Sequence, residues 1–192
     1  MTLEVLNTIA SIGTLLVILA TAIAAIGQLR HMRGSNQIQA LTECREVLES
    51  EDFARAQQFV ARELPAMMAD PKIREALMSP PLPESLRAIN VVGNFFESMG
   101  SFVKHGIIDA EIAQDLWAGI VVQSWNALVP VLAVTRRMAG NGVWENFEYL
   151  AAMSKEWLNE HPNGLYPAGR ARLVVEDVWR AEDQRIGIYR KR

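Results

Sequence analysis

Apolar positions are densest at the start of the chain. Between Glu4 and Arg30 every residue is uncharged, and most of residues 5–29 are apolar. A helix needs about 20 such residues to cross a bilayer core, so the run predicts a membrane-spanning helix over residues 1–30. A buried helix of a soluble protein is the alternative, for which an uncharged run of this length is unusual.

The charges that flank this run set the predicted orientation. The chain begins with the acidic segment MTLE, and Arg30, His31 and Arg33 follow the apolar run. A cleaved signal peptide has its basic residues in front, although the small residues around Ala22 would suit a signal peptidase and keep that alternative open. With basic residues on the inner side, the N-terminus lies outside and residues 31–192 form a cytoplasmic domain.

Polar residues within the run recur in phase with a three- and four-residue spacing and share one face of the predicted helix. The members of this polar stripe are Asn7, Ser11, Thr14, Thr21 and Gln28. Hydroxyl and amide groups in a bilayer are best satisfied against another helix, so the stripe predicts a homo-oligomer in which it packs between spans or lines a pore. In the alternative, a simple anchor, the hydroxyls bond to carbonyls of their own helix.

Beyond residue 30 the apolar spacing is helical throughout and predicts an all-α bundle. Positions at i, i+3 and i+4 recur in successive segments, and no Asn-Gly hairpin with alternating flanks occurs. The prolines in residues 79–85 predict an extended connector inside one domain. Residues 117–134 are apolar enough for a second span, but Gln123, Asn126 and Pro130 favour a buried central helix instead.

Composition narrows the possible classes of protein. The chain has 192 residues and a formal net charge of −3, which provides no basic surface for general nucleic-acid binding. Cys44 is the single cysteine, so the chain forms no internal disulfide. We expect an ordinary thiol on a helix, with lipidation beside the membrane as the alternative. His31, His105 and His161 are too dispersed to bind a metal together, so we expect no metal and no cofactor.

The familiar catalytic signatures are missing from the sequence. It has no P-loop, no H-E-x-x-H and no G-x-S-x-G motif. Helical nucleases of the HEPN class place a histidine somewhat more than one helical turn after an arginine. Arg30 and His31 are adjacent, and no arginine precedes His105 or His161 at that spacing. A degenerate HEPN-like nuclease or hydrolase is therefore an alternative to a non-enzymatic protein, not the leading prediction.

One group of polar residues in strongly apolar segments is the candidate site. Asn94 and Glu97 share a face of a predicted helix, and Arg136 and Arg137 lie at the end of the central helix. A buried carboxylate needs a partner, so we expect these four residues to form a buried polar network in which an arginine pairs with Glu97. Such a network either holds the helices in register or binds a small polar or anionic ligand. Further polar residues in apolar surroundings are Asn90, Asn146 and Glu148.

Four segments carry a family resemblance: QLRHMRGSNQ after the predicted span, FFESMGSFVKHGIID, LWAGIVVQSWNALVPVLAVTRR and NFEYLA. Together they resemble a family of small bacterial single-span membrane proteins that is catalogued as a domain of unknown function. The resemblance covers roughly residues 15–152. It implies a bacterial inner membrane and one N-terminal span, but no activity.

In architecture alone, a span followed by a helical domain, the chain is also similar to the membrane accessory protein of type VI CRISPR systems. That likeness implies a membrane pore and a role in antiviral defence. The HEPN-like Arg/His motif of that protein has no counterpart in this sequence, so the likeness implies no nuclease residues.

The combined prediction is an all-α, membrane-anchored homo-oligomer that acts as a non-enzymatic effector or scaffold. Its expected partners are the lipid bilayer, copies of itself and a cytoplasmic protein, without nucleic acid. The alternatives are a degenerate HEPN-like nuclease or hydrolase, and a passive membrane tether for a protein partner.

Overall fold

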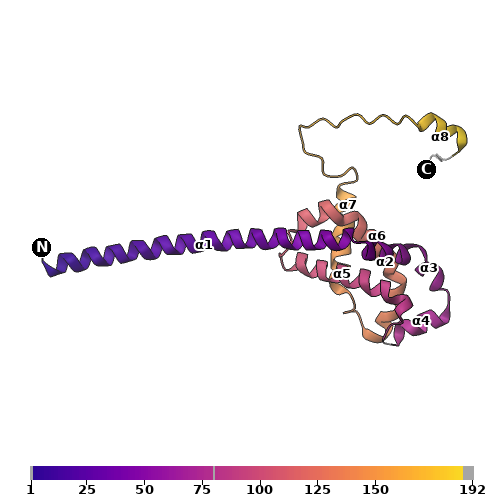
Figure 1. Cartoon of the computed structure of the whole chain (residues 1–192), viewed down its shortest axis with the longest axis horizontal. Coiled ribbons are helices and arrows are strands. Elements are labelled where there is room, and N and C mark those ends of the chain that lie inside the picture. Colours follow the sequence, from indigo (N-terminus) through magenta and orange to yellow (C-terminus); the bar gives the residue numbers. More distant parts are fainter. Residues whose placement is uncertain (1, 80, 188–192) are drawn as a thin grey trace. The chain divides into compact units, whose positions relative to one another are not determined.

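All regular structure in the described part of the chain, residues 2–79 and 81–187, is helical (Figure 1). This computed structural model divides into two compact units, Met1–Pro162 and Asn163–Arg192. The helices are α1 (Leu3–Glu49), α2 (Glu51–Arg62), α3 (Leu64–Met67), α4 (Pro71–Met78), the 3-10 turn η1 (Glu84–Leu86), α5 (Arg87–Lys104), α6 (Ala110–Ala139), α7 (Glu145–Glu160) and α8 (Arg180–Ile186). The predicted all-α fold is confirmed.

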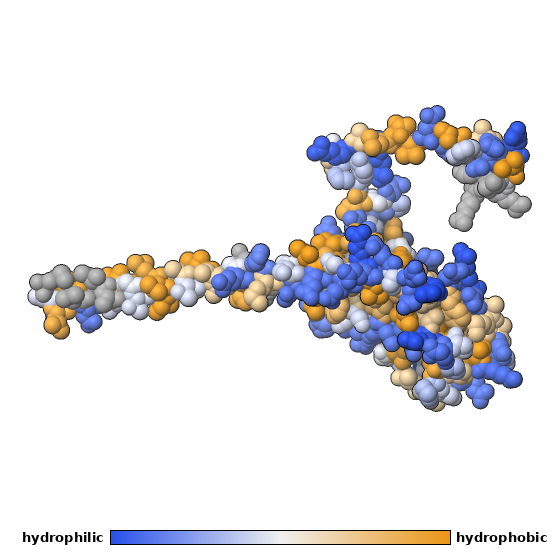
Figure 2. Space-filling view, in the orientation of Figure 1, coloured by the Kyte–Doolittle hydropathy of each residue, from blue (hydrophilic) through white to orange (hydrophobic). Residues whose placement is uncertain are grey.

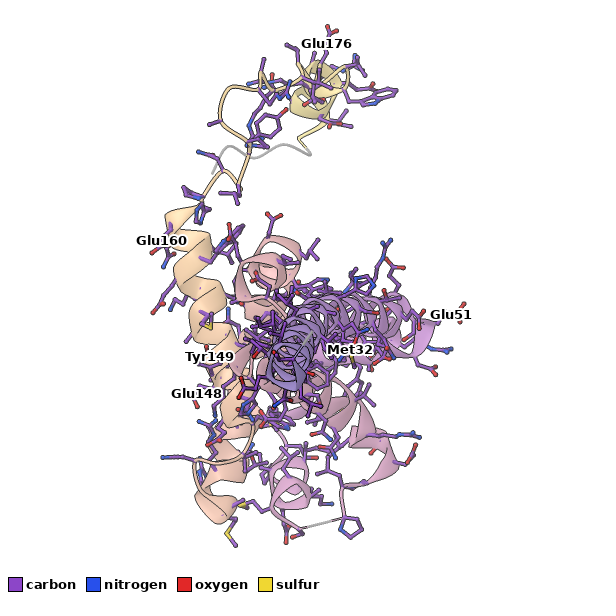
Figure 3. The ribbon with its side chains drawn as sticks, turned by 90° about the vertical axis from the view of Figure 1, so that its left-hand side faces the viewer. Met32, Glu51, Glu148, Tyr149, Glu160 and Glu176 are labelled. Carbon is purple, nitrogen blue, oxygen red and sulfur yellow. The ribbon has the colours of Figure 1, made fainter. Side chains whose placement is uncertain are left out.

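The first helix is much longer than the rest. α1 has 47 residues and is about 70 Å long at 1.5 Å per residue. Every described side chain before Gln37 is exposed, and only the last turns join the other helices, with Ala40 and Cys44 buried. Figure 3 looks along α1 from its N-terminal end, with Met32 on the exposed part.

The region after the apolar run continues as the same helix. Ser35 and Asn36 are residue types that can cap a new helix, which left open whether the first helix ends there or continues. The structure shows that α1 runs through both of them. The side chains of Arg30 and Arg33, which belong to the predicted basic cluster, lie outside the described residues. α1 therefore links the apolar run to the bundle without a break.

α1 and α6 are both long and apolar enough to cross a membrane. None of the apolar window of α1 is buried, whereas 39% of the window in α6 is buried inside the protein. α6 places Leu128 and Val131 in the core, while Leu116 and Val129 are exposed. The long helix α6 thus has one face in the core and one face outside it.

Local capping signals explain where the bundle helices begin. Ser50 ends α1 with an extended backbone and caps α2, because its Oγ accepts a hydrogen bond from the Phe53 amide at 3.2 Å. Asp109 caps α6 by accepting from two backbone amides, at 3.0 and 3.1 Å. Asp70 followed by Pro71 starts α4 in the arrangement that N-cap and N1 positions favour. Serine and aspartate are residue types that favour N-cap positions, so the sequence itself indicates these three starts.

Aromatic side chains from α2, α5, α6 and α7 form the centre of the bundle. Phe96 stacks on Phe147 with ring centroids 5.0 Å apart, and Trp125 meets Phe147 edge-on at 5.1 Å. Phe53 of α2 meets Phe96 edge-on at 6.0 Å. All three phenylalanines are at most 1% exposed. This core holds α5 against the corner between α6 and α7, where the candidate residues lie.

Candidate functional site

The candidate site is the face of α5 that carries Asn94 and Glu97, together with the corner between α6 and α7. Two glycines on this face of α5 allow a close approach. A Cβ at Gly93 would collide with the Trp144 ring, and a Cβ at Gly100 would collide with the backbone carbonyl of Asn146. The corner therefore docks on α5 only because these positions have no side chain.

Glu97 caps the start of α7 from a neighbouring helix. Its carboxylate accepts hydrogen bonds from the side-chain amide of Asn146 at 2.7 Å and from the backbone amide of Phe147 at 2.9 Å. The first amides of a helix have no partner within the helix, and a negative charge there is favourable. The N-cap residue of α7 itself makes no capping bond through its side chain. Glu97 thus supplies the cap that the local sequence does not.

Trp144, the residue before α7, has a left-handed backbone, with φ 52° and ψ 44°. This conformation costs about 1–2 kcal/mol for a residue other than glycine. The indole Nε1 donates to Oδ1 of Asn94 at 3.0 Å, and the ring lies against Gly93. The strained corner is held by contacts with α5, not by its own turn sequence.

Arg136 holds the other side of the corner. Its Nε and Nη2 donate to the backbone carbonyl of Val143 at 3.0 and 2.7 Å. Its Nη1 pairs with Glu148 Oε2 at 2.7 Å, and its guanidinium lies 6.0 Å from the centroid of the Trp125 ring. The Arg136 side chain is 18% exposed and that of Glu148, labelled on α7 in Figure 3, is 51% exposed. These contacts fix the end of α6 to the start of α7.

The four predicted site residues do not form a single buried network. Asn94 and Arg137 are exposed, and Glu97 and Arg136 are half-buried. Glu97 bonds to the start of α7, and Arg136 pairs with Glu148 instead of Glu97. Arg137 forms no ion pair within the described residues. The contacts of Glu97 and Arg136 lie at the edge of the core, because the corner between α6 and α7 is itself half-exposed.

Sequence reasoning missed Trp144 and the two glycines of α5. Gly93 and Gly100 lie seven residues apart, on the same face as Asn94 and Glu97, and this spacing was the available signal. The sequence around Trp144 contains no signal for a left-handed backbone at this residue, because glycine and asparagine are the residues that adopt that conformation most readily. Asn146 was singled out as polar, but its contact with Glu97 bridges helices far apart in sequence.

The polar contacts at the corner join helices to one another, and we call this set of contacts the joint. Glu97 and Arg136 direct their polar atoms to α7 and its preceding turn. Lys104 extends the joint by donating to Asn146 Oδ1 at 3.1 Å. No group of three histidine, cysteine, aspartate or glutamate side chains is placed to hold a metal ion in the part of the chain that the structure describes.

The polar stripe lies on the exposed part of α1. Ser11 Oγ donates to the Asn7 carbonyl at 2.9 Å, and Thr21 Oγ1 donates to the Val17 carbonyl at 2.8 Å. Thr14 and Gln28 are exposed on the same helix. In the single chain the hydroxyl groups of Ser11 and Thr21 therefore find their acceptors within their own helix.

Cys44 lies in the core where α1 joins the bundle, and it is 5% exposed. Burial, and secondly the charge of the neighbouring Glu43, raises the pKa of the Cys44 thiol above its usual range. A thiol that is buried and neutral is a poor nucleophile. This position fits an ordinary core cysteine.

The fold and the site define a helical bundle carried on a long, exposed, apolar helix. Residues 15–157 match the family model DUF4760, described as a domain of unknown function. The match covers most of the chain, so the protein belongs to this family, and the resemblance predicted from the four sequence segments is confirmed. No curated protein and no solved structure matches the chain. The matched residues include α5 and the corner between α6 and α7, and they exclude the second unit.

Proposed function

We propose that this protein is a membrane-anchored helical scaffold whose copies associate through α1. One observation carries the proposal: α1 is unbroken from the exposed apolar run, residues 5–29, to the buried turns at Ala40 and Cys44. A helix whose end is held in the core leaves no flexible linker. From Leu29 to Ala40 the helix rises about 17 Å, which would keep the bundle close to the membrane surface.

The proposed location of the bundle is the cytoplasmic face of a bacterial inner membrane. The acidic residue Glu4 precedes the apolar run, and Arg30, His31 and Arg33 follow it. Basic residues beside a span favour the cytoplasmic side. The family resemblance supports a bacterial membrane as the setting.

The phase of α1 supports self-association along the polar stripe. At about 100° per residue, Gln28 lies about 160° around the helix from Cys44, and Thr21 lies about 140° from it. Cys44 faces the bundle, so this end of the stripe points away from the docked helices. Two copies can therefore bring their stripes together in the membrane while their bundles stay on the outer sides.

The hydroxyl contacts favour close helix packing over an open pore. Ser11 and Thr21 already donate to carbonyls of their own helix, so they need no water to satisfy them. Small side chains on one stripe allow helices to approach closely in lipid. The proposal is therefore a scaffold of packed spans, and a conducting pore is an outcome that the test below would detect.

Mass measurement of the full chain in mild detergent tests the proposal. The wild-type chain should be a discrete oligomer that floats with vesicles after reconstitution. The stripe variant, Ser11→Leu, Thr14→Leu and Thr21→Leu together, should dissociate to monomers. A matched variant on the opposite face, Ile12→Leu, Leu19→Ile and Ile23→Leu together, should keep the wild-type mass.

Four results would contradict parts of this proposal. A chain that stays in solution without detergent would refute the anchor, and an oligomer unchanged in the stripe variant would refute the interface. If wild-type protein lets ions pass through the vesicle membrane and the stripe variant does not, the spans form a pore and are not closely packed. RNA or nucleotide turnover that Glu97→Gln abolishes would favour the enzymatic alternative, whereas the proposal gives Glu97 a structural role.

A further inference from the structure

The polar stripe of α1 continues past the apolar run in steps of seven residues. Seven polar residues at this spacing are exposed along the helix, and we call them the heptad row: Asn7, Thr14, Thr21, Gln28, Ser35, Thr42 and Glu49. A seven-residue repeat kept along a helix is the pattern with which two helices stay side by side in a left-handed coiled coil. Figure 2 shows the side chains of α1 lying open before the helix reaches the bundle.

Close to the bundle, the heptad row forms one wall of a groove between α1 and α6. The groove has a volume of about 410 Å³, and its lining includes Ile38, Leu41 and Thr42 of α1 and Leu116 and Trp117 of α6. Ile38 is 67% exposed and Leu116 is 59% exposed. Large apolar side chains left open on both walls of a groove are typical of a surface that a partner covers.

We infer that this groove binds α1 of a second copy of the chain, an inference that rests on the proposed association along the polar stripe. Because α1 has no break between Thr21 and Glu49, a copy that pairs along the stripe carries its own residues 35–49 past the groove. Ile38 lies about 14 Å beyond Leu29 along the helix, which puts it outside the lipid core in the proposed arrangement. A second copy is therefore the occupant that the geometry brings to this site, and the groove extends the interface beyond the membrane.

The groove opens on a side of α1 that a second copy can reach. Cys44 faces the bundle, and at about 100° per residue Thr42 lies about 160° and Ile38 about 120° around the helix from it. Two copies related by a two-fold axis present the same surface to each other. Their Ile38 side chains then meet near the axis, and Leu116 of each copy packs beside α1 of the other. The two bundles stay on the outer sides of the pair.

The charged residues of the groove balance each other. Arg45 Nε donates to Glu49 Oε1 at 2.7 Å within α1, and both side chains are mostly exposed. A second copy brings the same two opposite charges, so each arginine has a carboxylate within its own helix and one on the other copy. Exposed ion pairs contribute little affinity but help to align two surfaces. The burial of Ile38 and Leu116 therefore supplies the affinity at this groove.

Disulfide cross-linking tests the position of the second copy, because Cys44 is the single cysteine of the chain. In a Cys44→Ala background, Ile38→Cys places a thiol in the groove. Val47→Cys is the matched control, because Val47 is 42% exposed and lies about 180° around the same helix from Ile38. A disulfide requires the two Cα atoms to lie within about 7 Å. Mild oxidation of the full chain in vesicles should therefore link most Ile38→Cys chains into dimers and few Val47→Cys chains.

A charge on the α6 wall tests the contribution of the bundle. Leu116→Glu, in the otherwise wild-type chain, should raise the concentration at which half of the oligomer dissociates in detergent by at least about tenfold, because leucine burial is lost on both copies. Met138→Glu is the matched control on the same helix, since Met138 is 72% exposed and lies outside the groove, and it should leave the dissociation unchanged. Equal dissociation of Leu116→Glu and the wild-type chain would overturn the inference.

Thr21→Cys, in the same Cys44→Ala background, keeps this inference apart from the proposed function, because Thr21 lies in the apolar run. If Thr21→Cys forms dimers and Ile38→Cys does not, the spans associate and only the groove inference is overturned, which leaves the groove to a different protein. If neither variant forms dimers and the wild-type chain has the mass of a monomer, both proposals are wrong. Equal cross-linking of Ile38→Cys and Val47→Cys would indicate random encounters and would also overturn the inference.

Discussion

Removing the carboxylate of Glu97 tests whether this residue caps α7 across the helix boundary. Glu97→Ala deletes two hydrogen bonds to a charged acceptor and leaves the Phe147 amide without its partner. Bonds to charged groups contribute about 1.5–3 kcal/mol each, and Glu97 is half-buried, so we expect a total loss of about 2–3 kcal/mol. For a chain of this size that corresponds to a fall in Tm of about 5–10 °C. Glu97→Gln keeps one acceptor oxygen and should lose about 1 kcal/mol.

The assay is thermal unfolding of the full chain in mild detergent, followed by tryptophan fluorescence, which reports on the bundle. A double-mutant cycle with Asn146→Ala should give a coupling of about 1 kcal/mol, the share of the 2.7 Å bond between the two side chains. Glu145→Gln is the matched control, because its carboxylate is exposed, lies 3.8 Å from Lys104 Nζ and should contribute less than about 0.5 kcal/mol. A Tm for Glu97→Ala within about 1 °C of the wild-type value would refute the cap.

Two further predictions concern glycine and cysteine positions in the bundle. Gly100→Ala should destabilise the bundle by about 2 kcal/mol or more, because its Cβ meets a backbone carbonyl that cannot move aside, whereas Gly119→Ala, where the Cβ meets open space, should stabilise α6 by about 0.5–1 kcal/mol. The two Tm shifts should therefore have opposite signs, and equal shifts would contradict the close approach at α5. Cys44 should react slowly with a thiol reagent until the bundle unfolds, because its thiol is buried and its pKa is raised. The pKa of Cys44 is raised in the folded state only, so the contribution of the neutral thiol to the free energy of unfolding is complete below the ordinary pKa of a thiol. This contribution falls as the pH rises above that value, because the unfolded chain then ionises first. In Cys44→Ala the free energy of unfolding should no longer show this fall at alkaline pH.

The local rules of sequence predicted where helices begin better than they predicted how helices meet. Ser50, Asp70 and Asp109 act through backbone amides two or three residues away, and such caps can be recognised in the sequence alone. The continuity of α1 through Ser35 and Asn36 was left open, because these weak helix formers can either cap a helix or be carried along in one. Extending an existing helix through Ser35 and Asn36 requires less free energy than nucleating a new helix after them.

The sequence predicted the site residues on α5, Asn94 and Glu97, but not the residues that they contact. Asn94 and Glu97 share a face because of their spacing, which the sequence shows directly. Their contacts with Trp144 and Phe147 depend on a left-handed backbone at the corner and on the missing side chain at Gly93. Such long-range geometry results from packing of the whole bundle, so local pattern does not contain it. The self-association of α1 along the polar stripe stays a prediction.

If the apolar run of α1 crosses a bilayer as proposed, the unbroken course of the helix has a consequence for the length of chain between bilayer and bundle. A continuous helix fixes the rotation of one end relative to the other. The number of residues in the stalk, the part of α1 between Leu29 and Ala40, therefore sets the direction in which the bundle faces relative to the span. One added residue turns the bundle by about 100° relative to the span, while seven added residues turn it by only about 20°. We therefore expect family members with a longer stalk to have lengthened it by near-whole helical turns, or to contain a break in the helix that restores the orientation.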